Sequence, residues 1–196
     1  MNVQVKDGRV FLSGISDVLA ERIYAERLIR QIPGVKSVEN NITIATDGTM
    51  KDDEIQYRIM EHLHKGPHKR ELENVRAHVK GGVVTLIGKV NTLSDKTNAK
   101  KMAERTPGIR DVINNISIQS QGMFTDDKIK SKINQLFSTV GIDSKDIELS
   151  VNKGNVTLSG FVKDMHQMEL AEELTMDVES VIKVKNRLKL WRDNKL

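Results

Sequence analysis

Apolar and polar residues alternate in three short stretches of the chain that share one pattern. The pattern is V-x-x-G-x-V-x-L-x-G, and it occupies residues 5–14, 79–88 and 151–160. Alternation with a period of two predicts strands with one buried face, and a central Asp-Gly or Gly-Gly pair predicts a two-residue hairpin turn. Lys153-Gly154 suits that turn less well, so we expect another loop in the third hairpin.

The similarity continues without a gap beyond each hairpin, which indicates a longer repeat. The offset is 74 residues from Gly8 to Gly82 and 72 residues from Gly82 to Gly154. Every copy closes on the pattern [VI]-x-x-V-x-N-x-[IL], with asparagine at positions 40, 114 and 186. We therefore divide the chain into module 1 (residues 1–46), module 2 (50–120) and module 3 (123–196).

A helix is predicted between each hairpin and the closing strand, at about residues 17–31, 93–105 and 164–177. Its inward stripe recurs at i, i+3 and i+7, as one helical face requires. The stripe residues are Ala25/Leu28/Ile32, Ala99/Met102/Thr106 and Ala171/Leu174/Val178. We expect the alanine to stand where the helix lies closest to the sheet.

A second helix is predicted ahead of the hairpin in modules 2 and 3, at about residues 52–65 and 125–140. Aspartates in its first turn suit the helix dipole. Its buried stripes are expected to be Ile55/Ile59/Leu63 and Ile129/Ile133/Leu136/Val140. Each full module is then a two-layer α/β sandwich in the order helix, strand, strand, helix, strand, with a three-stranded sheet and helices on one face. Residues 45–51 and 119–124 are expected to be short linkers.

Module 1 begins about two residues before its first strand, so its sheet is expected to be half covered. An apolar face of a few hundred Å² left in water costs several kcal/mol, at about 25 cal/mol per Å². Residues 192–196 are too few to form a helix that could cover this face. We therefore expect the face over Ala25 and Leu28 to pack against another module or to support self-association with a second molecule. The remaining alternative is that the natural protein extends upstream with the helix and an export signal.

Glycines mark two places in each repeat. Gly8, Gly82 and Gly154 belong to the hairpin turns, and Gly14, Gly88 and Gly160 follow the second strand. At the latter positions we expect a bend or the close approach of another backbone. A phosphate-binding loop is not expected, because no G-x-G-x-x-G or G-x-x-x-x-G-K pattern surrounds them.

The module order, the hairpin pattern, the alanine of the second helix and the closing pattern together resemble the BON domain. The resemblance spans nearly the whole chain in three copies, although module 3 has Glu179 where the other modules have proline. It implies a non-enzymatic protein of the bacterial envelope or osmotic-stress response that binds anionic phospholipid. One branch of the family is cytosolic and binds potassium, and potassium binding is the first alternative function. A protein-interaction scaffold is the second.

Composition narrows the function classes further. The chain has no cysteine, and no run reaches the ~18 apolar residues of a membrane span. The residues after Met1 include no apolar stretch of an export signal. We therefore expect a cytoplasmic protein if Met1 is the natural start, and a periplasmic or envelope-associated protein if the start lies upstream.

Basic residues provide the candidate lipid site. Residues 1–46 hold six basic and five acidic side chains, residues 50–120 hold 13 and nine, and residues 123–196 hold 12 of each. The surplus lies in module 2, where a basic helix face is expected, and two further lysines lie one turn apart on the leading helix of module 3. The predicted lipid-binding residues are Lys96, Lys100, Lys101, Arg105, Lys128 and Lys132.

Other chemistry has weaker support in the sequence. No nucleophile with a base and no carboxylate pair recurs in the modules, so no catalytic residue is predicted. His62 and His64 are two apart on a helix and diverge, and His68 lies in a basic stretch, so neither a metal nor another cofactor is expected. Nucleic acid is not an expected partner, because the G-x-x-G loop of KH domains and the aromatic platform of RRM domains are both missing.

Overall fold

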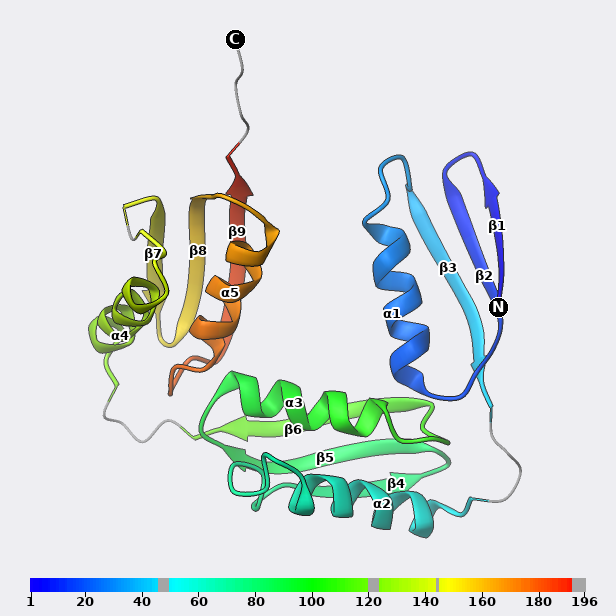
Figure 1. Ribbon diagram of the computed structural model, residues 1–196. Helices are drawn as coiled ribbons and strands as arrows, with labels where there is room; N and C mark the ends of the chain where they lie inside the picture. Colours follow the sequence, from blue (N-terminus) through cyan, green and yellow to red (C-terminus); the bar gives the residue numbers. More distant parts are fainter. Residues whose placement is uncertain (46–49, 120–123, 144, 192–196) are drawn as a thin grey trace. The chain divides into compact units, whose positions relative to one another are not determined.

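Each repeat forms its own three-stranded sheet with helices on one face, as the computed structural model of residues 1–45, 50–119, 124–143 and 145–191 shows (Figure 1). The α/β class and the three-module architecture predicted from the sequence are therefore confirmed. Within the predicted linkers, residues 46–49 and 120–123 lie outside the described residues, as do residues 192–196. The strands are β1 (Asn2–Lys6), β2 (Arg9–Ser16) and β3 (Ser37–Ile44) in module 1, β4 (Arg76–Lys80), β5 (Val83–Val90) and β6 (Asp111–Ile118) in module 2, and β7 (Ile147–Asn152), β8 (Asn155–Val162) and β9 (Lys183–Leu190) in module 3.

The helices follow the predicted order. In module 1, α1 connects the hairpin to the last strand. Modules 2 and 3 have an equivalent connecting helix, α3 or α5, and an additional leading helix, α2 or α4. Their bounds are α1 (Leu19–Arg30), α2 (Asp52–Lys65), α3 (Leu93–Glu104), α4 (Asp126–Thr139) and α5 (Met165–Met176).

The second strand of every hairpin is the central strand of its sheet. In module 1, β2 pairs antiparallel with β1 and parallel with β3, with Leu12 opposite both Val3 and Asn40. Module 3 repeats this arrangement, with β8 antiparallel to β7 and parallel to β9. A parallel connection needs a crossover, and the helix after the hairpin provides it.

The core lies between the helices and one face of each sheet. In module 3, the inward strand residues Val156, Leu158 and Leu188 pack with Ile133 and Phe137 of α4. Module 1 has a much smaller buried cluster of Val10, Leu12 and Ile42. Since α1 is the only helix among the described residues of module 1, less apolar surface is buried there.

The predicted inward stripe of α1 is wrong in two of its three positions. Ala25 packs against the core together with Ile29, but Leu28 is 44% exposed and Ile32 is 54% exposed. The equivalent Leu174 and Val178 of module 3 pack against its core, where α4 lies beside α5. Leu28 and Ile32 thus face the side that a leading helix covers in module 3.

The predicted stripe of α4 is wrong at its end. The buried residues of α4 are Ile129, Ile133 and Phe137, whereas Val140 is 42% exposed. The helix ends at Thr139, so Val140 no longer follows the helical face. The buried stripe therefore has the same i, i+4, i+8 spacing as Ile55, Ile59 and Leu63 in α2.

The expectation of a different loop in the third hairpin is also wrong. Lys153 and Gly154 have φ angles of 48° and 73°, close to the 51° and 82° of Asp7 and Gly8. The Asp126 carboxylate accepts hydrogen bonds from the backbone N–H of Lys153 at 2.8 Å and of Gly154 at 3.0 Å. This contact from α4 stabilises a backbone conformation that lysine rarely adopts.

The same contact in module 2 predicts a pH-dependent stability. Gly81 and Gly82 donate to the Asp52 carboxylate at 2.7 and 3.1 Å, and these two hydrogen bonds lower the pKa of Asp52 below 3.8. A lowered folded-state pKa gives stability that is complete above the unfolded-state pKa and is lost as the pH falls through the folded-state pKa. We expect the attachment of α2 to weaken only below about pH 4.

Carboxyl and amide NMR signals of the full chain, followed from pH 6 to pH 2, measure this directly. Asp52 is expected to titrate below its ordinary value and the Gly81 and Gly82 amide signals to move with it. The same amides should lose that movement in Asp52→Asn. A midpoint for Asp52 above 4 would show that the two hydrogen bonds do not form.

Candidate functional site

The basic residues predicted on α3 do not share one side of the helix. Lys96 and Lys100 are four residues apart and lie on one side, whereas Lys101 lies about 100–140° around the helix from them, at about 100° per residue, and Arg105 follows the end of α3 at Glu104. The Lys100 ammonium is 3.5 Å from the Glu104 carboxylate. The structure therefore does not bring the four cations into one patch.

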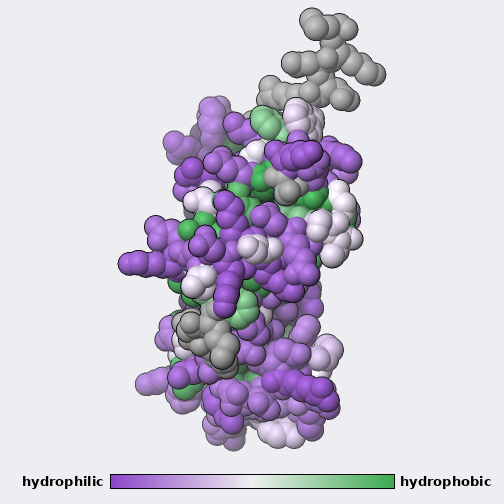
Figure 2. Space-filling model, turned by 90° about the vertical axis from the view of Figure 1, so that its left-hand side faces the viewer, coloured by the Kyte–Doolittle hydropathy of each residue, from purple (hydrophilic) through white to green (hydrophobic). Residues whose placement is uncertain are grey.

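Lys128 and Lys132 of α4 are both exposed and line a shallow depression with Phe124. Asp127 lines the same depression and offsets part of its positive charge. The Lys132 ammonium donates to the Gln135 side-chain carbonyl at 3.4 Å. The face of the molecule in Figure 2 is largely hydrophilic, with small hydrophobic areas.

A row of four cations that the sequence interpretation missed lies on β9. Lys183, Lys185, Arg187 and Lys189 occupy every second position of the strand, and all four are exposed. Successive side chains of a strand point to opposite faces, so these four share the face directed away from the helices. Residues two apart in a strand are about 6.6 Å apart, which makes a continuous basic row.

Neutral residues adjoin this row on the central strand. Asn155, Thr157, Ser159 and Phe161 of β8 stand opposite the four cations in the parallel register. On β7, the exposed Glu148 pairs with Ser159 and is the only acidic residue of the described strands of module 3. The row is thus close to free of compensating negative charge on its own sheet.

Two aromatic rings stand at one end of the row. Phe161 and Trp191 are 42% and 54% exposed, and their ring centroids are 5.0 Å apart at an interplanar angle of 32°. The Trp191 backbone N–H donates to the Val162 carbonyl at 2.9 Å, which holds the residue beside the sheet. We call the four cations and these two rings the basic sheet face.

The signal for the basic sheet face is present in the sequence as K-V-K-N-R-L-K-L at residues 183–190. The net charge of module 3 does not reveal this row, because acidic residues elsewhere in the module balance its basic residues. The corresponding outward positions are Ser37, Glu39, Asn41 and Thr43 in module 1, and Asp111, Ile113, Asn115 and Ser117 in module 2. The basic sheet face therefore distinguishes module 3 from its sister modules.

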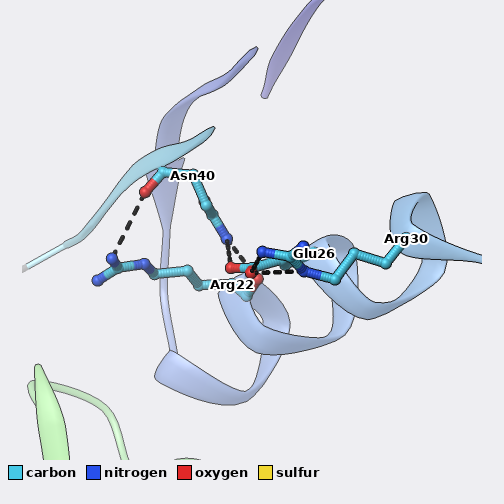
Figure 3. Close-up of polar contacts among 4 residues, drawn as sticks. All are labelled: Arg22, Glu26, Arg30 and Asn40. Atoms are coloured by element: carbon cyan, nitrogen blue, oxygen red, sulfur yellow. Dashed lines mark hydrogen bonds and ion pairs between the residues drawn. The ribbon is translucent and has the colours of Figure 1, made fainter. Parts of the chain in front are cut away.

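The asparagine that recurs in the closing strand connects that strand to the connecting helix. The Asn40 side-chain amide donates to the Arg22 carbonyl at 2.9 Å and to the Glu26 carboxylate at 3.2 Å (Figure 3). Arg30 donates to the same carboxylate and lowers the pKa of Glu26. Asn186 makes the equivalent bond to Glu172 at 2.9 Å. These contacts attach the connecting helix to the closing strand.

The histidines do not gather into a ligand set. The His64 ring contacts the Val75 carbonyl at 3.0 Å, which gives it a structural partner. In the part of the chain that the structure describes, no three His, Asp or Glu side chains are close enough to share a metal ion. No helix in the same part is both long and apolar enough to cross a bilayer.

Two solved structures show a distant likeness to this chain. The C-terminal domain of CdsD, a structural protein of the type III secretion system of Chlamydia trachomatis, is 16% identical, with a TM-score of 0.31 over 97% of this chain and 90% of that one. The periplasmic domain of PrgH is 14% identical, with a TM-score of 0.26 over 97% and 95% of the two chains. Similarity at this level carries no functional argument.

Sequence comparisons identify the family. An uncharacterized protein in the gshII 5' region of Anaplasma centrale is 29% identical over 126 residues, which are 61% of this chain and 82% of that protein. The BON domain profile matches residues 1–46, 51–120 and 125–190, so it covers most of the chain. Together with three sheets of the same strand order, this match shows that the chain belongs to the BON domain family.

Proposed function

We propose that this chain is a non-enzymatic BON-repeat protein of the bacterial envelope and osmotic-stress response, and that it binds anionic phospholipid surfaces through the basic sheet face of module 3. The observation that carries the proposal is the exposed row Lys183, Lys185, Arg187 and Lys189, which ends in Phe161 and Trp191. The residues predicted on α3 and α4 contribute less, because Glu104 and Asp127 offset part of their charge.

The charges are sufficient for reversible surface binding. A basic side chain near an anionic bilayer contributes about 1 kcal/mol, so four contribute about 4 kcal/mol, or roughly a thousandfold in partitioning. Tryptophan is favoured at the level of the lipid headgroups, where an apolar ring and a polar N–H both find partners. The basic sheet face combines both kinds of side chain on one exposed surface.

Protection of a sheet edge is the simpler explanation of lysines on β9. Charged residues on an edge strand discourage pairing with the sheet of another molecule. The equivalent edge strands β3 and β6 have no basic residue at the corresponding outward positions, and the row continues into two exposed aromatic rings. Edge protection alone does not account for either difference, whereas binding to an anionic surface accounts for both.

Co-sedimentation of the full chain with vesicles tests the proposal. We expect binding to phosphatidylcholine vesicles that contain phosphatidylglycerol, little binding without it, and weaker binding at higher salt because screening shortens the range of attraction. Lys185→Glu with Arg187→Glu is expected to weaken binding by about 30-fold or more, as the loss of two contributions of about 1 kcal/mol implies.

Lys128→Glu with Lys132→Glu is the matched control, because it makes the same charge change in the same module. It is expected to weaken binding only a few-fold. An equal loss in both double variants would mean that net charge, and not the basic sheet face, controls binding. Tighter binding to a single-stranded oligonucleotide than to the vesicles at the same salt concentration would reject lipid as the ligand.

A further inference from the structure

Helix α5 of module 3 has a row of carboxylates on the side that faces away from the sheet. Ala171 and Thr175 of this helix are buried, whereas Glu169, Glu173 and Asp177 are exposed. The three acids are spaced at i, i+4 and i+8, so they lie along one side of the helix and are about 6 Å apart along its axis. Asp177 is the C-cap residue and keeps a right-handed helical backbone, which places it in the same row. We call Glu169, Glu173 and Asp177 the acidic helix row.

The acidic helix row and the basic sheet face both lack a charge partner in module 3. Among the residues that the structure describes, no ion pair involves a carboxylate of the row or one of the four cations on β9. The lysines of α4, which lies beside α5, form no ion pair with the row either. Each row is therefore available to a partner of opposite charge.

Module 3 differs from its sister modules on both faces. The positions of the acidic helix row hold Ile23, Arg27 and Gln31 in module 1 and Thr97, Lys101 and Arg105 in module 2. The outward positions of the closing strand are basic in module 3 and neutral or acidic in the other two. A solvated helix surface accounts for charged residues on α5, but basic residues serve that purpose at the same positions of the sister modules. It does not account for opposite charges on the two faces of one module.

The two rows also match in spacing. The cations of β9 are about 6.6 Å apart, and the acids of α5 are about 6 Å apart. Each row ends in exposed apolar side chains, which are the two rings of the basic sheet face and, one turn before Glu169, the 52% exposed Met165. A methionine sulfur packs favourably against aromatic rings. With Met165 on the rings, the acids Glu169, Glu173 and Asp177 fall opposite Lys189, Arg187 and Lys185.

The two rows cannot meet within one molecule. Figure 1 shows α5 on one face of the sheet of β7, β8 and β9, and the four cations point away from the other face. When the rows of two molecules meet, each molecule still has one free row, of opposite sign to that of the other. Such a contact joins different surfaces of identical chains and is therefore head-to-tail.

We propose that the acidic helix row binds the basic sheet face of a second copy of this chain, head to tail. Anionic lipid and the second copy then compete for the same cations, so an anionic membrane surface releases single chains from the assembly. Only this competition rests on the proposed function. The contact between copies stands on the charges and spacing of the two rows.

The salt dependence of self-association gives the first test. The chain has a net charge of +4, so if net charge governed the interaction, copies would repel one another most at low salt. We expect the opposite, which is association at about 10 mM salt, where charges act over about 30 Å, and dissociation at about 1 M salt, where they act over about 3 Å. Exposed ion pairs add little affinity each, so sedimentation velocity is measured at upper micromolar concentrations of the full chain. A monomer at low salt, or association that survives at high salt, would overturn the proposal.

Two variants test the head-to-tail contact itself. Glu169→Lys with Glu173→Lys removes the acidic helix row, and Lys185→Glu with Arg187→Glu removes the basic sheet face. Each variant alone is expected to associate at least about tenfold more weakly, since it loses two ion pairs and gains repulsion. An equimolar mixture is expected to form a one-to-one complex that does not grow, because each variant supplies the row that the other has lost. A mixture that stays monomeric would contradict a head-to-tail contact.

The matched control is Glu71→Lys with Glu73→Lys, two exposed positions in module 2. It changes the net charge as much as Glu169→Lys with Glu173→Lys does and is expected to change self-association little. An equal loss in both would assign the effect to net charge and reject the acidic helix row.

Vesicles that contain phosphatidylglycerol test the competition. They are expected to dissociate the unaltered chain, and they should still bind Glu169→Lys with Glu173→Lys, whose basic sheet face is intact. Assemblies that persist on the vesicles would refute the competition. An absence of lipid binding with an intact response of the mixed variants would reject the proposed function and leave the contact between copies in place.

Discussion

Replacing Gly160 with alanine is expected to destabilise module 3 by about 3 kcal/mol or more, which is a large part of the stability of a small domain. Gly160 has a φ of 115°, a conformation that costs other residues about 1–3 kcal/mol. An added Cβ would also fall on the Asp146 carbonyl oxygen, far inside van der Waals contact. That carbonyl accepts a hydrogen bond from the Phe161 amide at 3.0 Å. The backbone before β7 therefore cannot move away from Gly160 without breaking this hydrogen bond.

Urea denaturation followed by the fluorescence of Trp191 measures this effect, because the chain has one tryptophan and it lies in module 3. Gly141→Ala is the matched control in the same module. Its φ of 74° is also positive, but an added Cβ would meet nothing within 4 Å. Gly141→Ala should therefore cost only the backbone strain of about 1 kcal/mol. An equal loss in both variants would show that the close approach to Asp146 does not limit stability.

The sequence predicts the repeats and their strands well because both depend on local periodicity. Alternation in β2, β5 and β8 determines which side chains can face a helix, and the recurring glycine pairs place the turns. The structure departs from these predictions where a neighbouring element decides the outcome. Lys153 adopts a positive φ, and Asp126, 27 residues earlier, stabilises that conformation by accepting its amide. Turn propensity alone does not include that contact.

The buried faces of the helices also depend on neighbouring elements that the sequence periodicity does not describe. A stripe at i, i+3 and i+7 describes α1 correctly as amphipathic, but Leu28 and Ile32 are exposed. The equivalent residues of module 3, Leu174 and Val178, pack against the core because a second helix lies alongside. A single helix on a sheet buries a narrower face, here through Ala25 and Ile29. Which edge of an apolar stripe is buried therefore depends on the packing partner, and periodicity does not identify that partner.

The basic sheet face was missed for a different reason. Net charge treats all side chains of a module alike, whereas a strand sorts them by position onto two faces. Lys183 and Lys185 add to each other because they share a face, while the acidic residues that balance them lie on other elements. Counting charges by strand face, once a strand is predicted, would have found this row before the structure.

Phe137→Ala is expected to destabilise module 3 by about 3–5 kcal/mol, as truncation of a buried aromatic side chain does. Phe137 is fully buried and packs in the cluster that α4 shares with the sheet and α5. Removal of its ring leaves a cavity at the last of the three buried positions of α4 and weakens the packing of α4 against the sheet. Trp191 fluorescence in urea gives the free energy of unfolding, and amide hydrogen exchange in α4 shows whether the helix detaches first.

Val140→Ala distinguishes the structure from the simple periodic stripe, in which Val140 was a buried residue. Val140 follows the end of α4 and is 42% exposed, so its truncation should cost no more than about 0.5 kcal/mol. A loss comparable to that of Phe137→Ala would mean that the helix continues past Thr139 and rotates a different face to the core. The i, i+4, i+8 spacing of the buried stripe would then not hold for α4.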